Sequence, residues 1–356
     1  MIYARLEAGE RLSAAEGLYL LQSPDLLRLG QLANLVRNRL HPTNAVSYTI
    51  TCNINYTNIC ISGCKFCAFY RRQNDPQAYL LNDEQILTAI GQGLKNGAIR
   101  VLLQGGLHPD LGIDYFERLF NKIRQKYQIQ IHALSPPEII HLSQLSGLNV
   151  TRILQRLKAS GLDSIPGGGA EILSQRTRAA LSPKKCSADD WLYVMEIAHS
   201  LGLPSSATMM FGHMETKEEI LEHLLRLRAL QDKSPGFIAF IPWTYQPGNT
   251  AKAAEEKIGR AAVSAFDYLR TLAVSRIMLD NIPNLQASLL TQGSKIAQLA
   301  LKFGANDIGD LLVEEHVLQA TGLNQDLSRA EVENLITEMG YQPGLRDTIY
   351  RFSHYS

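Results

Sequence analysis

The chain of 356 residues has no long hydrophobic run. No stretch approaches the ~20 consecutive apolar residues that a helix needs to cross a bilayer, so we expect no membrane insertion. The first ten residues carry charged side chains early and have no apolar signal core. We therefore expect a cytoplasmic protein whose thiols are kept reduced.

An excess of either charge is also missing. The 35 Lys and Arg residues are balanced by 34 Asp and Glu residues. Proteins that bind through phosphate contacts usually show a basic excess. We therefore expect no nucleic-acid partner, although this balance is compatible with a local basic pocket for an anionic small-molecule substrate.

Cysteine is scarce, and its distribution argues against a disulfide framework. There are five cysteines, an odd number, and three of them lie within eight residues. The cysteines of a disulfide framework would be spread along the chain. Apolar residues make up 45% of the sequence, which is typical of a soluble globular protein with a sizeable core.

Strand-like and helical segments alternate after residue 45. Before it, Ser13 and Glu16 fit a capping box that is followed by apolar residues at helical spacing, which predicts an N-terminal helical extension over residues 1–45. The strand candidates are residues 46–56, 99–104, 129–134, 164–166, 205–211, 237–242, 285–287 and 307–308. Such alternation predicts an α/β fold, a (β/α)8 TIM-type barrel over residues 46–325, followed by a helical cap over residues 326–356. With six strands the barrel would be a partial one. In either case the active site is expected at the C-terminal ends of the strands.

Cys60, Cys64 and Cys67 form a CxxxCxxC motif directly after the first strand candidate. Three thiolates this close can hold three irons of a cubane cluster and leave the fourth iron open for another ligand. A structural zinc site needs four closed ligands, and a ferredoxin cluster needs a fourth nearby cysteine. We therefore predict that these three residues are metal ligands of a [4Fe–4S] cluster, while Cys52 and Cys186 are ordinary cysteines.

The segment from Asn55 to Tyr70 resembles the signature of radical S-adenosylmethionine (SAM) enzymes. The resemblance implies that SAM binds the open iron of the [4Fe–4S] cluster, and that an external one-electron donor such as a flavodoxin or ferredoxin reduces the cluster. It also implies that Phe66 lies near the adenine.

Further cofactor-binding residues follow from the same resemblance. Gln104, Gly105 and Gly106 correspond to a Gly-Gly-Glu-like segment whose backbone carbonyls bind the methionine amino group, although this chain lacks the Glu. The segment 166–170 would form a wall of the site, with Glu171 accepting a ribose hydroxyl. Taken alone, the two glycines could be a simple strand-ending turn, and Glu171 a helix-start carboxylate favoured by the helix dipole. Ser135 and His132, at the end of the third strand candidate, could touch the ligand or be structural.

The substrate side of the site also follows from resemblance. Residues 240–250, with the sequence FIPWTYQPGNT, are similar to the dehypoxanthine futalosine cyclases of menaquinone biosynthesis. This implies that Trp243 and Tyr245 stack on a benzoate ring and that Gln246 and Asn249 bind polar groups. Alternatively, this is a proline-rich loop whose aromatic residues only pack. His213 is expected where the fifth strand candidate enters the site, although a lone His is usually structural.

The resemblance implies a radical SAM cyclase. A 5′-deoxyadenosyl radical would take hydrogen from the ribose 4′ carbon of dehypoxanthine futalosine, and the sugar radical would close a ring onto the benzoate. One alternative is a sibling radical SAM enzyme, an aminofutalosine synthase or a deazaflavin synthase subunit, with a different loop over residues 240–250. The other is a non-catalytic iron–sulfur or zinc protein.

Overall fold

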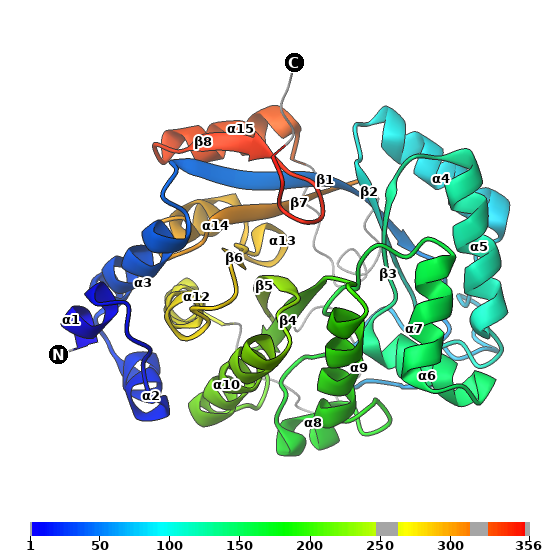
Figure 1. The fold of residues 1–356 in the computed structure, drawn as a ribbon, viewed down its shortest axis with the longest axis horizontal. Helices are drawn as coiled ribbons and strands as arrows, with labels where there is room; N and C mark the ends of the chain where they lie inside the picture. Colours follow the sequence, from blue (N-terminus) through cyan, green and yellow to red (C-terminus); the bar gives the residue numbers. More distant parts are fainter. Residues whose placement is uncertain (1, 247–262, 314–326, 353–356) are drawn as a thin grey trace.

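The computed structural model describes residues 2–246, 263–313 and 327–352. Helices surround the strands in this part of the chain, and the N-terminal helices lie to one side (Figure 1). The strands are β1 (Ala45–Asn55), β2 (Arg100–Gln104), β3 (Gln130–Ala133), β4 (Ser205–Phe211), β5 (Phe237–Thr244), β6 (Asn284–Leu285), β7 (Asp307–Val313) and β8 (Gln342–Leu345).

All the strand pairs are parallel, and they form two sheets. One sheet has the order β3-β2-β1-β7, with β8 also paired to β1, and the other has the order β4-β5-β6. Isolated bridges connect the two sheets, from His132 to Ser164, from Ile165 to Ser205 and from Gln286 to Asp307. Seven of the predicted strand segments thus match the observed strands, with small shifts of their ends.

The expectation of one closed eight-stranded barrel is corrected by these pairings. The predicted strand 164–166 contributes only two isolated bridges and no ladder. Its last residue, Pro166, has no N–H to donate, and the three glycines that follow it do not favour extended structure. The fold is therefore an α/β fold with two parallel sheets, linked where residues 164–165 and 286 bridge between them.

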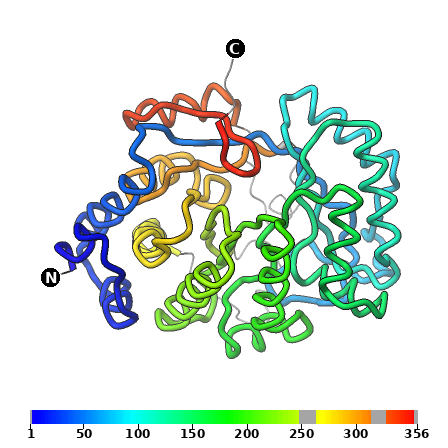
Figure 2. The backbone as a smooth tube through the Cα atoms, viewed as in Figure 1, coloured from blue at the N-terminus to red at the C-terminus, as the bar shows by residue number. Residues whose placement is uncertain are grey.

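Helices alternate with the strands, as the path of the backbone in Figure 2 shows. They are α1 (Ile2–Glu7), α2 (Ala14–Gln22), α3 (Leu26–Leu40), α4 (Asp83–Lys95), α5 (Ile113–Lys126), α6 (Pro136–Ser146), α7 (Val150–Ala159), α8 (Gln175–Leu181), α9 (Ala188–Ser200), α10 (Lys217–Lys233), α12 (Ala265–Met278), α13 (Leu289–Gln292), α14 (Ser294–Ala300) and α15 (Arg329–Glu338). The capping box of Ser13 and Glu16 begins α2, as predicted. The N-terminal helices are anchored to the rest of the fold because α3 packs against α12.

A strand that the sequence did not predict, β8, lies beside β1. Residues 45–48 of β1 pair in register with residues 342–345. The backbone N–H of Arg346 donates to the carbonyl of Tyr48 at 2.9 Å, and the Arg346 guanidinium forms a buried ion pair with Asp307 at 2.5 Å. The C-terminal segment, expected to be a helical cap, therefore consists of α15 and an added strand.

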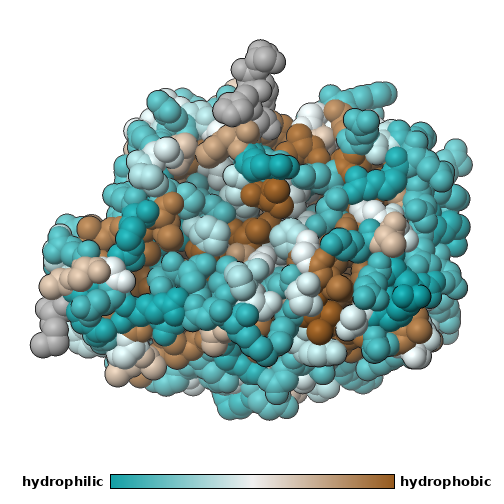
Figure 3. Space-filling view, viewed as in Figure 1, coloured by the Kyte–Doolittle hydropathy of each residue, from teal (hydrophilic) through white to brown (hydrophobic). Residues whose placement is uncertain are grey.

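The interior is one continuous apolar cluster, whereas the face seen in Figure 3 is mostly hydrophilic, with apolar residues in the furrows. In the part of the chain that the structure describes, no helix is long and apolar enough to cross a membrane.

Candidate active site

Two adjoining cavities lie among the strands and the loops that follow them. The central cavity, of about 390 Å³, is lined by residues from six strands and from the loop after residue 166. The cysteine pocket, of about 210 Å³, is lined by all three cysteines of the motif. The cavities share walls at Asn55, Phe66, Cys67, Gln104 and Gly169.

The loop that carries the cysteines is tied to its neighbours through its backbone. The hydroxyl of Thr57 donates to the carbonyl of Tyr79 at 2.6 Å and accepts from the N–H of Ile59 at 3.1 Å. The N–H of Cys60 donates to the carbonyl of Arg71 at 3.0 Å. The N–H of Lys65 donates to the carbonyl of Leu181 at 3.0 Å. These bonds hold the loop over the end of β1, where the cysteine pocket opens.

The three cysteines share one pocket, which is what common ligation of a cluster requires. Among the described residues, however, no three His, Cys, Asp or Glu side chains already stand in a metal-binding arrangement. Burial, followed by the nearby Cys64, raises the pKa of Cys67 to about 11, so binding of a metal must displace the proton of this thiol. Cys52 and Cys186 do not line the pocket.

Gly105 and Gly106 line the cysteine pocket and have no room for side chains. A Cβ on Gly105 would lie 2.7 Å from the ring of Tyr56, and one on Gly106 would lie 2.2 Å from the carbonyl oxygen of Ile59. The N–H of Gly106 also donates to the carbonyl of Thr57 at 2.9 Å. The two glycines therefore allow the end of β2 to lie directly against the cysteine loop.

Ser135 lines the cysteine pocket as the N-cap of α6, but its hydroxyl donates to Glu138 at 2.5 Å. Glu138, which the sequence analysis missed, is 4% exposed and lines the same pocket. The pattern Ser135-Pro-Pro-Glu138 is a capping-box signature that could have pointed to this carboxylate.

Glu171 lines the central cavity and forms a buried ion pair with Lys185 at 2.6 Å. Burial alone would raise the pKa of Glu171, but the Lys185 ammonium holds it below its ordinary value. Burial likewise acts against the charge of Lys185, but the nearby Cys64 and Glu171 hold its pKa above the ordinary value. The ammonium also lies 5.3 Å above the centre of the Phe66 ring. Lys185, which no sequence signal indicated, thus places a positive charge beside the cysteines.

His213 is 2% exposed and does not line either cavity among the described residues. Its Nδ1 lies 2.8 Å from the carboxylate of Glu215. Its ring lies between Phe66 and Tyr245, with centroid distances of 6.4 Å and 5.5 Å. His213 therefore packs against one aromatic residue of the cysteine loop, Phe66, and one residue after β5, Tyr245.

The C-terminal end of β5 and the two residues after it bring Trp243, Tyr245 and Gln246 to the central cavity. The side-chain amide of Gln246 donates to the hydroxyl of Thr244 at 2.9 Å. Asn249 lies outside the described residues. Three of the four predicted substrate-binding residues of the loop therefore reach the cavity that adjoins the cysteines.

Buried polar side chains line one end of the central cavity, and of these the sequence analysis named only His132. Arg100 forms an ion pair with Asp310 at 2.6 Å and donates to Thr51 at 2.9 Å. His132 lines the same end, and its Nδ1 lies 2.7 Å from the hydroxyl of Ser164. Burial, followed by the charge of Arg100, lowers the pKa of His132 well below its ordinary value, so this imidazole is neutral.

Two family models match the chain. The Radical SAM superfamily matches residues 54–227, and the CofH/MqnC C-terminal region matches residues 234–356. A solved structure of methylornithine synthase has a TM-score of 0.74 at 20% identity, covering 96% of this chain and 97% of that chain. A structure of the [FeFe]-hydrogenase maturase HydG has a TM-score of 0.76 at 17% identity, covering 96% and 75%. Both structures share the α/β fold.

Three relatives are similar over nearly the whole chain. Cyclic dehypoxanthine futalosine synthase of Streptomyces coelicolor is 40% identical, over 98% of this chain and 87% of the relative. A 5-amino-6-(D-ribitylamino)uracil–L-tyrosine 4-hydroxyphenyl transferase of Methanosarcina barkeri is 39% identical, over 94% and 89%. Aminodeoxyfutalosine synthase of Thermus thermophilus is 37% identical, over 98% and 94%. The chain therefore belongs to the CofH/MqnC family of radical SAM enzymes and works with a [4Fe–4S] cluster and SAM.

Proposed function

We propose that the protein is a cyclase that converts dehypoxanthine futalosine to cyclic dehypoxanthine futalosine on the futalosine route to menaquinone. The observation that carries this proposal is the position of Trp243, Tyr245 and Gln246 on the wall of the central cavity, next to the cysteine pocket. These residues belong to the segment of the sequence that resembles the cyclases. The 40% identity to the Streptomyces coelicolor synthase supports the same assignment.

The cysteine pocket is the proposed cofactor site. Cys60, Cys64 and Cys67 would each hold one iron of the cluster. When bound, the cluster and SAM would supply 5′-deoxyadenosyl radical chemistry for removing the hydrogen from the ribose 4′ carbon. Because Phe66, Gln104 and Gly169 line both cavities, a SAM molecule in the pocket would adjoin a substrate in the central cavity.

The central cavity is the proposed substrate site, and its residues have three tasks. Trp243 and Tyr245 present aromatic surface to the benzoate ring, on which the new bond forms. Gln246 and Glu171 present polar groups on the wall of the central cavity. The walls would hold the reacting atoms within roughly 3–3.5 Å of each other, which a reactive radical needs for selectivity.

Two sibling activities remain as alternatives because the relatives that carry them are nearly as similar. These are aminodeoxyfutalosine synthesis, at 37% identity, and the 4-hydroxyphenyl transfer to 5-amino-6-(D-ribitylamino)uracil, at 39% identity. The non-catalytic alternative is not supported, because the relatives that match are enzymes.

An anaerobic assay with substrate deuterated at the ribose 4′ carbon tests the proposal. We expect one deuteron to appear in 5′-deoxyadenosine, read by mass spectrometry, as the cyclic product forms. Cyclisation with unlabelled 5′-deoxyadenosine would contradict the abstraction site. Absence of cyclisation, with turnover of either sibling substrate in parallel reactions, would reassign the function.

A further inference from the structure

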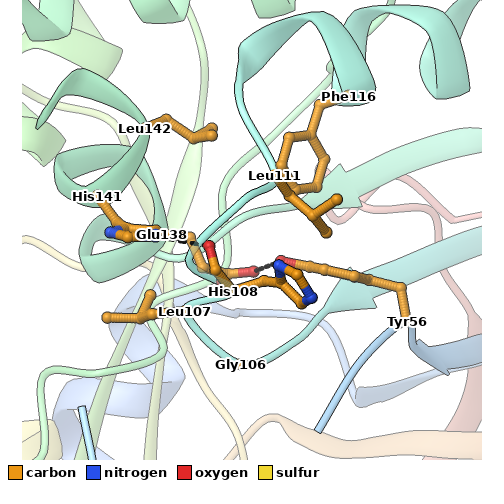
Figure 4. Close-up of a pocket in the computed structure, with 9 residues that line it drawn as sticks. All are labelled: Tyr56, Gly106, Leu107, His108, Leu111, Phe116, Glu138, His141 and Leu142. Atoms are coloured by element: carbon orange, nitrogen blue, oxygen red, sulfur yellow. Dashed lines mark hydrogen bonds between the residues drawn. The ribbon is translucent and has the colours of Figure 1, made fainter. Parts of the chain in front are cut away.

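Buried polar side chains are normally paired within a protein, and the carboxylate in Figure 4 is an example. The figure shows Glu138 reaching toward the hydroxyl of Tyr56 in a small cavity next to the cysteine pocket. One oxygen of Glu138 accepts from that hydroxyl at 2.8 Å, and the other accepts from the N–H of Ser135 at 2.7 Å and from its hydroxyl at 2.5 Å. Both oxygens of this carboxylate are therefore satisfied without a ligand.

The polar end of the central cavity differs, because some of its buried polar atoms have no hydrogen-bond partner. This end consists of Arg100, His132, Gln286 and Asp310, which all line the cavity. The Nε and Nη2 atoms of Arg100 donate to Thr51 and Asp310, at 2.9 Å and 2.6 Å, but its Nη1 atom has no partner among the described residues. Over the same part of the chain, the side-chain amide of Gln286 and the Nε2 atom of His132 have none either. Arg100, Gln286 and His132 are nevertheless only 6%, 8% and 4% exposed.

Asp310 adds an acceptor to these donors. Its Oδ1 atom accepts from Thr51 at 2.8 Å and from Arg100 at 2.6 Å, whereas its Oδ2 atom has no hydrogen-bond partner in the described part of the chain. Burial would raise the pKa of Asp310, but the Arg100 guanidinium holds it below its ordinary value, so the carboxylate is ionised. Gln286 lies next to this strand, because a Cβ on Gly309 would lie 2.7 Å from the amide nitrogen of Gln286. The polar end therefore presents donors and an acceptor close together.

The charges of the polar end favour hydroxyl groups over a carboxylate as the ligand. Arg100 and Asp310 neutralise each other and the imidazole of His132 is neutral, so the polar end has no net positive charge to attract an anion. A ligand carboxylate has no hydrogen to donate to Asp310 and would be repelled by it. A hydroxyl both donates and accepts. Two neighbouring hydroxyls can therefore accept from Arg100 and Gln286 while they donate to Asp310.

The position of the polar end also suits the sugar of the proposed substrate. Arg100 is the first residue of β2, and Gln104, which lines the cysteine pocket, is the last, so the two are roughly 13 Å apart along the strand. Trp243 lies near the C-terminal end of β5, on the side of the cysteines. In a ribose the hydroxyls on carbons 1′ and 2′ lie across the ring from carbon 4′. A ribose bound by these hydroxyls would turn its 4′ carbon toward the cysteine pocket and leave the benzoate near Trp243.

We propose that Arg100, Gln286 and Asp310 form a subsite for neighbouring sugar hydroxyls, which binds the ribose of the substrate at the end of the central cavity away from the cysteines. The identity of this sugar rests on the proposed function. The three residues take no part in hydrogen abstraction. Their task is to fix which carbon of the ribose faces the cofactor.

The experiment measures equilibrium binding to the protein loaded with its cluster and SAM, without a reductant so that no turnover occurs. Three ligands are compared: dehypoxanthine futalosine, its 2′-deoxy analogue, and the analogue that lacks the benzoate carboxylate. The wild type should bind the full substrate roughly tenfold more tightly than the 2′-deoxy analogue. Asp310→Asn should lower that preference roughly tenfold and Gln286→Met roughly threefold, because hydrogen bonds to charged groups contribute more. The preference over the analogue without the carboxylate should stay unchanged in both variants.

Asp307→Asn is the matched control for Asp310→Asn. Asp307 also forms a buried ion pair, with Arg346, but it lines neither cavity. Its replacement should lower the melting temperature and leave both preferences unchanged. An equal loss of preference in Asp307→Asn would overturn the proposal, because the effect would then be purely structural.

The other outcomes are equally decisive. Unchanged preferences in Asp310→Asn and Gln286→Met, with tight binding by the wild type, would overturn the hydroxyl subsite alone. Tighter binding of the full substrate by Asp310→Asn, with a greater preference over the analogue without the carboxylate, would show a carboxylate subsite instead. If Asp310→Asn does not fold, Gln286→Met decides, since it keeps the ion pair of Arg100. A wild type that binds none of the three ligands would overturn the proposed function as well, which separates the two failures.

Discussion

Replacement of Gly106 by Ala tests whether the contact between the end of β2 and the cysteine loop is required. The added Cβ would lie 2.2 Å from the carbonyl oxygen of Ile59, 2.7 Å from its carbonyl carbon and 2.8 Å from the Cβ of Cys60. The first distance is 1.2 Å short of the 3.4 Å at which ordinary contacts begin. Two of the three atoms are backbone, so the loop must move as a unit. Such overpacking typically costs roughly 1–3 kcal/mol of unfolding free energy.

Gly112→Ala is the matched control, six residues further along the same loop. No atom lies within 4 Å of its Cβ position, and its φ of −82° suits any residue. Ala lowers the conformational entropy of the unfolded chain, which stabilises the folded state, whereas an N-cap position prefers Gly to Ala. The two effects on the free energy of unfolding therefore offset each other to within about 0.5 kcal/mol.

The assay combines the melting temperature of the cluster-free proteins with iron and sulfide per chain after anaerobic reconstitution. Gly106→Ala should melt at a lower temperature and retain clearly less cluster, because Cys60 is displaced. Gly112→Ala should match the wild type in both measurements. If Gly106→Ala also matched the wild type in both, the close approach of β2 to the cysteine loop would have no part in cluster binding.

Three further predictions rest on other parts of the chain. Replacing any one of the three cysteines of the 60–67 loop with Ala should abolish both the iron–sulfur absorbance and SAM cleavage, whereas Cys52→Ala should retain a reducible cluster; a cluster that survived loss of a loop cysteine would contradict the ligand assignment. Trp243→Ala should slow substrate turnover while SAM affinity stays near the wild-type value, since loss of a ring stack costs roughly 0.5–1.5 kcal/mol beyond the buried area; equal losses would place Trp243 in a structural role. Burial lowers the pKa of His223 to about 3, so the unfolded chain binds a proton that the folded chain does not, and stability should fall as the pH is lowered from about 6.5 towards 3. His223→Gln should flatten that part of the stability profile in acid-unfolding measurements, and an unchanged slope would refute the assignment.

The sequence predicted the elements whose signals are local. A capping box located the start of α2, and β-branched runs located most strands to within a few residues, because both signals depend on near neighbours. The strand β8 was missed because its sequence, Gln342-Pro-Gly-Leu345, has poor strand propensity. It is extended only because β1 lies beside it, which is a tertiary effect.

The residues of the candidate site also differ in whether a local sequence pattern indicates them. Residues in compact motifs, such as the three cysteines and the pair Gly105 and Gly106, were found, and they line one pocket. Lys185 and Arg100 were missed because their partners, Glu171 and Asp310, lie 14 and 210 residues away along the chain. No local pattern indicates such a pair.

The position of β1 has a consequence for the order in which the protein matures. β1 carries the cysteine loop at its end, yet it pairs with β7 and β8, and Thr51 bonds to Asp310 across a separation of 259 residues. During synthesis the pairing of β1 can therefore be completed only after β7 and β8 have been made. Closing such distant contacts is slow, and a partly made chain would expose the unpaired edge of β1. The cluster is thus expected to be inserted only after β7 and β8 have been synthesised and have paired with β1.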